Sequence, residues 1–154
     1  MTEFYKSVTY IVIAFLICLF AQEIESSFIN DFANNFIGLL TTLLAINIAS
    51  GSLIAGKLKE ISIQTGHGFD KTKKELKRSL SVQLVLIAIS FVILLIKTSK
   101  LFSNLLGANT LALVSNTITV AIFIYYLDTI KDLGQALFSL LDFDKKDKDS
   151  QKEK

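Results

Sequence analysis

Apolar residues along this chain are gathered into four long stretches, and charged residues fill the segments between them. An α-helix needs about 20 mainly apolar residues to cross the hydrocarbon layer of a membrane. Three of the stretches meet this requirement, and the first does so once Phe4 and Tyr5 are included, with the Lys6 side chain reaching back to the interface. The pattern predicts an all-α, polytopic membrane protein with four transmembrane helices. The stretches without Asp, Glu, Lys or Arg are 16, 25, 18 and 27 residues long and cover Ser7–Gln22, Phe32–Gly56, Ser79–Ile96 and Leu101–Leu127.

The whole of residues 1–141 is expected to form a single transmembrane domain. Apolar residues keep a helical spacing past the second span, at Leu58 and Ile61, and past the fourth span, between Ile130 and Leu141. Helices two, three and four are therefore expected to extend beyond the membrane. Residues 142–154 are almost all charged or polar, which predicts a disordered tail. The expected spans cover residues 4–22, 34–56, 79–96 and 109–127.

Lys and Arg are distributed unevenly between the two ends of these spans. Fourteen of the 16 lie in the N-terminal stub, in the loop from Lys57 to Arg78 or in the tail after Leu127, whereas the other connections hold only Lys97 and Lys100. Cations beside a span resist translocation, so segments rich in them stay in the cytoplasm. The distribution predicts a multi-pass protein of the cell inner membrane with both termini cytoplasmic, the N-in/C-in orientation.

The middle loop is the most basic segment of the chain. We expect it to be the turn of a helical hairpin that projects into the cytoplasm and binds a soluble protein partner. An alternative is that the cations only set the topology and attract anionic lipid. The candidate partner-binding residues are Lys71, Lys73, Lys74, Lys77 and Arg78.

The second span carries small residues at steps of three and four, which gather on one helix face. Small side chains let another backbone approach closely, and such contacts replace the hydrophobic force that lipid cannot supply between helices. We expect this small-residue stripe to pack helices together in a homo-oligomer. It consists of Ala45, Ala49, Ser52 and Gly56.

Polar but uncharged side chains lie near the centres of the second and fourth spans. Asn47 and Asn116 could bond to each other and fix the register of the two helices, a contact worth roughly 0.6 kcal/mol in a membrane protein. Alternatively, Asn47, Asn116 and Thr117 could line a polar pore at the axis of an oligomer. Both interpretations stay open at this point.

Composition mainly excludes classes of function. The chain is 51% hydrophobic with a mean hydropathy of +0.52, only modestly above a soluble domain, so the distribution of charge carries the membrane prediction. Cys18 and His67 are the only Cys and His, which excludes an intramolecular disulfide and leaves no recognisable metal site within one chain. Carriers driven by protons usually need a carboxylate or His inside a span, and none is present. We expect no cofactor, no enzymatic activity and, with a net charge of +2, no direct nucleic-acid binding.

The chain also resembles a known family in size, topology and Lys content. With four expected spans and a basic hairpin around Gly66-His67-Gly68-Phe69-Asp70-Lys71, it looks like the membrane subunit of Kiwa-type bacterial antiphage defence. The resemblance implies an oligomer in the inner membrane that senses phage attack and works with a cytosolic, DNA-engaging partner. No functional residue is carried over from that family.

The leading hypothesis is a non-enzymatic, oligomeric inner-membrane component that presents a basic cytoplasmic platform to a soluble partner. A second hypothesis is a pore-forming or channel-type protein, such as an effector or toxin. A third is an immunity protein that intercepts a pore-forming toxin within the bilayer.

Overall fold

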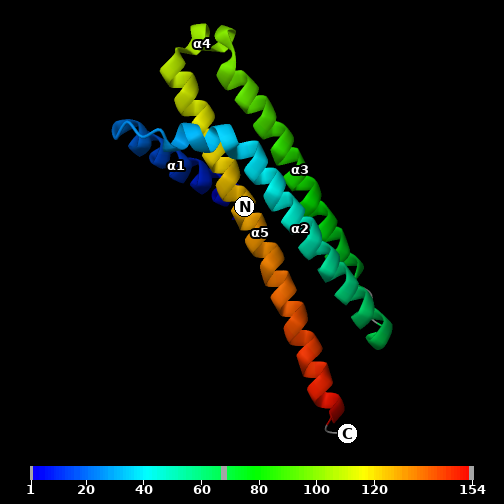
Figure 1. Cartoon of the computed structure of the whole chain (residues 1–154). Helices are drawn as coiled ribbons and strands as arrows, with labels where there is room; N and C mark the ends of the chain where they lie inside the picture. Colours follow the sequence, from blue (N-terminus) through cyan, green and yellow to red (C-terminus); the bar gives the residue numbers. More distant parts are fainter. Residues whose placement is uncertain (1, 67–68, 153–154) are drawn as a thin grey trace.

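The computed structural model contains five helices joined by short connections (Figure 1). It describes the backbone of residues 2–66 and 69–152, and the side chains of residues 4–63, 66, 69–70 and 72–135. All regular secondary structure in these segments is helical, which confirms the predicted all-α class. The helices are α1 (Thr2–Glu23), α2 (Phe28–Thr65), α3 (Asp70–Thr98), α4 (Lys100–Leu106) and α5 (Ala108–Lys152).

Within the described residues, four helices are long and apolar enough to span a membrane, as the sequence predicts. They are α1, α2, α3 and α5, with apolar segments at Phe4–Glu23, Phe28–Ile63, Thr72–Thr98 and Ala108–Gln135. Helix α2 begins six residues before the predicted start of the second span, because the turn that follows α1 occupies only residues 24–27. The first large difference from the sequence analysis is therefore at the α1–α2 connection.

Helix α5 is the centre of the molecule and contacts every other helix (Figure 1). In its most apolar window 44% of the residues are buried, against 11% in the corresponding window of α3. Many apolar side chains of α1 and α3 point outward and are exposed. An apolar surface of this extent is typical of contact with lipid. The arrangement is a bundle in which α1, α2 and α3 pack against α5.

Three buried clusters hold α1 and α2 against α5. The first joins α1 and the start of α2 to α5, the second joins α2 to α5 at Phe36 and Tyr126, and the third joins α2 to α5 beyond Ile54. The Tyr126 hydroxyl donates a hydrogen bond to the Leu40 carbonyl oxygen at 3.1 Å. A fully buried tyrosine needs such a partner for its hydroxyl.

Helix α2 changes direction within its first turns, which lie across α5 before the helix continues alongside α3 (Figure 1). Two threonines beside Gly38 donate hydrogen bonds to carbonyl oxygens four residues earlier, Thr41 to Ile37 at 2.8 Å and Thr42 to Gly38 at 2.9 Å. Such bonds compete with the backbone ladder and favour bending of a helix. The bend lets one helix contact both neighbours.

The α2–α3 turn begins where the sequence predicts it. Gly66 adopts a left-handed conformation with φ of +71°, and its N–H donates to the Ser62 carbonyl oxygen at 3.0 Å. Glycine takes this conformation without the steric cost that a Cβ imposes. His67 and Gly68, which the sequence also assigns to the turn, lie outside the described residues.

Helix α5 continues to Lys152, so the structure describes helix over most of the segment for which the sequence predicts a disordered tail, 142–154. No Gly or Pro follows Gly134. Nothing in the segment therefore breaks the helix that the apolar residues before it establish.

Candidate functional site

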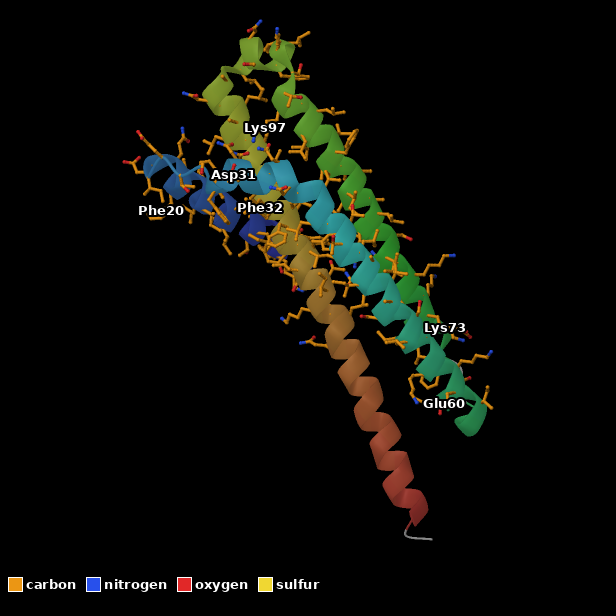
Figure 2. All side chains as sticks on the ribbon, viewed as in Figure 1. Phe20, Asp31, Phe32, Glu60, Lys73 and Lys97 are labelled. Atoms are coloured by element: carbon orange, nitrogen blue, oxygen red, sulfur yellow. The ribbon has the colours of Figure 1, made fainter. Side chains whose placement is uncertain are left out.

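The basic segment predicted as a partner-binding site forms the first turns of α3. Lys73, Lys74, Lys77 and Arg78 have exposed side chains, and Lys73 lies near the tip of the α2–α3 hairpin, opposite the end that holds Lys97 (Figure 2). The Lys71 side chain lies outside the described set. The structure thus places four of the five predicted cations on one projecting element.

Local ion pairs neutralise only part of this charge. Lys73 lies 4.0 Å from Asp70, and Lys57 on α2 lies 2.7 Å from Glu60. Among the described side chains, Lys74, Lys77 and Arg78 make no ion pair. The hairpin therefore presents uncompensated positive charge to whatever lies beyond this end of the bundle.

The hairpin is braced by apolar contacts with α5. Leu133 of α5 packs in a buried cluster with Ile54 and Leu58 of α2, and Leu76 of α3 packs against the same cluster. The sequence analysis expected apolar residues at helical spacing beyond the fourth span, and Leu133, one of these residues, meets the hairpin here. The cations are therefore displayed from a packed support rather than from a loop.

Helices α2 and α3 approach each other closely at Gly51, which explains why a glycine lies inside α2. A Cβ built on Gly51 would lie 3.2 Å from Cδ1 of Leu76. Gly51 is buried, whereas the residues of the predicted small-residue stripe are exposed. The inner face of α2 is thus a different face from the stripe.

Among the described residues, the small-residue stripe packs against no other helix of the chain. All four of its members are exposed. The stripe as a contact between subunits stays a prediction, since the structure describes a single chain.

Asn47 is buried and bonds to a partner that the sequence analysis did not assign to it. Its Nδ2 donates a hydrogen bond to Oε1 of Gln83 on α3 at 2.9 Å. The predicted bond between Asn47 and Asn116 is therefore absent from the described structure, because the two side chains meet α3 at different levels of the bundle, Asn47 at Gln83 and Asn116 at Lys97. Gln83 is completely buried, and its Nε2 has no partner among the described residues.

Asn116 belongs to a second polar cluster, close to the α4 end of the bundle. The Lys97 Nζ donates hydrogen bonds to Oδ1 of Asn116 at 2.9 Å and to Oδ1 of Asn30 at 3.2 Å. Asn116 Nδ2 approaches Asn30 Oδ1 at 3.4 Å. Three helices, α2, α3 and α5, each contribute one residue.

The Lys97 cluster was missed because the sequence analysis placed Lys97 in a connection outside the third span. In the structure, α3 continues to Thr98 and carries this cation inward, where it is half-buried. Two features of the sequence could have indicated this cluster. Lys97 directly follows the apolar run, and Asn30 and Asn116 carry hydrogen-bond acceptors at the same end of their helices.

The third residue of the predicted polar core or pore, Thr117, is also buried within the single chain, 7% exposed, as are Asn47 at 3% and Asn116 at 9%. All three side chains therefore contribute to the interior of the bundle.

A cleft of about 400 Å³ opens beside the Lys97 cluster, between α1, the α1–α2 turn and α5. Asn30 and Asn116 line it together with Cys18, Glu25 and Asn109. The oxygen atoms of Asn30 and Asn116 are already engaged by the Lys97 ammonium, which satisfies them without a ligand. A second cleft, of about 590 Å³, lies between α3 and α5 at the hairpin end.

Among the described residues, no group of three or more His, Cys, Asp and Glu side chains is placed so that it could hold a metal ion. No family model matches this chain, and no curated protein and no solved structure matches it either.

Proposed function

We propose that this chain is a non-enzymatic, oligomeric component of the bacterial inner membrane whose α2–α3 hairpin binds a soluble protein in the cytoplasm. The observation that carries the proposal is the braced hairpin with its unpaired, exposed cations Lys74, Lys77 and Arg78. Residues 70–78 hold five cations and two carboxylates. The partner that fits this surface has an acidic patch, because opposite charge accelerates encounter and fixes orientation.

The proposed orientation places the hairpin and both termini in the cytoplasm. It rests on the excess of Lys and Arg at the hairpin end of the bundle, since cations beside a span are retained on that side. In this orientation α4 and the Lys97 cluster face the opposite side of the membrane. The resemblance to Kiwa-type membrane subunits makes antiphage defence the proposed biological setting.

We further propose that copies of the chain associate through the small-residue stripe. Ala45, Ala49, Ser52 and Gly56 are exposed on α2 while the opposite face of that helix is buried. Close backbone approach at such residues is a usual mode of helix association in lipid. The variant Ala49→Leu should reduce the mass of the detergent-solubilised complex, and an unchanged mass would contradict this interface.

Affinity purification from cells tests the platform. The full-length protein, extracted in mild detergent, should recover a soluble acidic protein, and the variant with Lys71, Lys73, Lys74 and Lys77 changed to Gln should lose it. Arg78 is kept because it lines the second cleft. The variant Lys100→Gln, on exposed α4 at the other end of the bundle, is the control and should retain the partner.

Two outcomes would overturn the platform in favour of another function. Ion conductance in liposomes that is altered by Asn116→Leu would favour a pore. Protection of cells against a pore-forming toxin, with no partner recovered, would favour an immunity protein.

A further inference from the structure

The cleft between α3 and α5 lies at the boundary between charge-free and charged sequence. On α3 the boundary falls between Arg78 and Ser79, and both residues line the cleft. On α1 it falls at Ser7, which also lines the cleft, and on α5 the lining runs from Tyr125 across the boundary to Leu133. In a membrane this is the level at which acyl chains end and headgroups begin.

The size and lining of the cleft suit an amphiphilic ligand. Its volume of about 590 Å³ is within the range of small-molecule sites. Leu76 and Val82 supply an apolar surface, and Thr72 supplies a hydroxyl group that donates or accepts hydrogen bonds. The Thr129 hydroxyl already donates to the Tyr125 carbonyl oxygen at 3.0 Å and is available as an acceptor. One part of a ligand would therefore contact hydrocarbon and another part polar groups.

The charged residues of the cleft are of both signs. Arg78 and Glu75 of α3 and Asp132 of α5 line it. All three are exposed, and none makes an ion pair with another described side chain. A purely anionic ligand would meet two carboxylates, and a purely cationic ligand would meet the guanidinium. A ligand that carries one charge of each sign matches the site.

We propose that this cleft binds a zwitterionic aminophospholipid, a lipid of the phosphatidylethanolamine class, from the leaflet at the hairpin end. The Arg78 guanidinium donates to the phosphodiester, for which its planar fork of N–H groups is suited. The carboxylates of Glu75 and Asp132 accept hydrogen bonds from the primary ammonium. The acyl chains continue along the apolar wall formed by Leu76 and Val82.

The same chemistry discriminates between lipid classes. A phosphatidylcholine headgroup has no N–H to donate to the carboxylates, and a phosphatidylglycerol headgroup brings no positive charge. Lys6 does not compete for the phosphate within the cleft, since it pairs with Asp128 at 3.6 Å. The inference shares Arg78 with the proposed platform but does not depend on it, and needs only that the helices span a membrane.

Native mass spectrometry of the full-length protein in mild detergent tests the assignment. Dioleoyl phosphatidylethanolamine, phosphatidylcholine and phosphatidylglycerol are titrated separately, and the bound fraction is measured. Phosphatidylethanolamine should bind at least about fivefold more tightly than either of the other two lipids. Arg78→Gln should weaken the binding of phosphatidylethanolamine about tenfold, as expected for loss of a charged hydrogen-bonding partner. Asp132→Asn should reduce the preference over phosphatidylcholine.

Matched controls keep the outcomes distinct. Lys100→Gln and Asp31→Asn remove one charge of each sign at the other end of the bundle and should leave all three affinities unchanged. Arg78→Lys retains the positive charge and should weaken binding less than Arg78→Gln. Equal binding of the three lipids, or a preference for phosphatidylglycerol, would overturn the proposal. Displacement of the lipid by an equal concentration of glycerophosphoethanolamine would overturn the assignment to a membrane lipid.

Discussion

The buried polar side chains show how single residues acquire partners in this fold. Asn47 bonds to Gln83, 36 positions away in sequence, and Asn116 bonds to Lys97, 19 positions away. An unpaired amide in hydrocarbon is costly, so the sequence indicates that each asparagine needs a partner. It does not indicate which one, because Gln83 and Lys97 become neighbours only when α3 packs against α2 and α5.

Replacing Lys97 tests the polar cluster at the α4 end. Lys97→Met should lower the free energy of unfolding by about 1–2 kcal/mol, because the amide oxygen of the buried Asn116 and that of Asn30 beside it lose a charged donor. Unfolding in mixed micelles, followed by far-ultraviolet circular dichroism, measures the change. Lys100→Met on exposed α4 is the matched control. Equal stability of the two variants would contradict a role for the cluster in holding α3 to α5.

At the scale of elements, α2 has two distinct faces. Gly51, Ile54 and Leu58 lie on the face that packs against α3 and α5, and Ala49 and Ser52 lie on the exposed face. The apolar composition of both faces is similar, so periodicity alone does not separate them in a membrane helix. The packing of Leu76 over Gly51 decides which face is internal.

Enlarging Gly51 tests this assignment. Gly51→Val should destabilise the protein by about 1–3 kcal/mol, because the new side chain would overlap Leu76 in a packed contact. Gly134→Val makes the same change on α5 where no atom lies within 4 Å of the added Cβ, and it should have a smaller effect. The free energy of unfolding in mixed micelles is again the measurement. A similar loss of stability in both variants would mean that the effect comes from helix propensity alone.

For the whole molecule, the main consequence of the fold is that the two ends differ. One end carries the basic hairpin, and the other carries α4 and Lys97 (Figures 1 and 2). The cleft of mixed charge lies at the hairpin end, and the Lys97 cluster lies at the α4 end. Because α5 contacts every other helix, both ends belong to one packed bundle. The orientation of the bundle in the membrane therefore decides which end a cytosolic protein meets.

Cysteine labelling tests the proposed orientation. In a Cys18→Ser background, Asn104→Cys on α4 should react with a membrane-impermeant maleimide in intact bacterial spheroplasts. Ile63→Cys, 75% exposed near the hairpin turn, should react only after permeabilisation. This pattern is expected because the Lys and Arg residues beside the spans keep the hairpin end in the cytoplasm. The reverse labelling pattern would place the hairpin outside and would contradict a cytoplasmic platform.

The sequence by itself determined the helical class, the four spans and the turn at Gly66, because these depend on local properties: the length of charge-free runs, and the left-handed conformation that glycine adopts easily. Only the tertiary structure decided that α5 is central, that Asn47 and Asn116 have separate partners, and that Arg78 faces a cleft shared with Asp132. In lipid every helix is apolar around most of its circumference. The fit of side chains between helices therefore decides which faces meet, and this fit cannot be read from the spacing of residues along one helix.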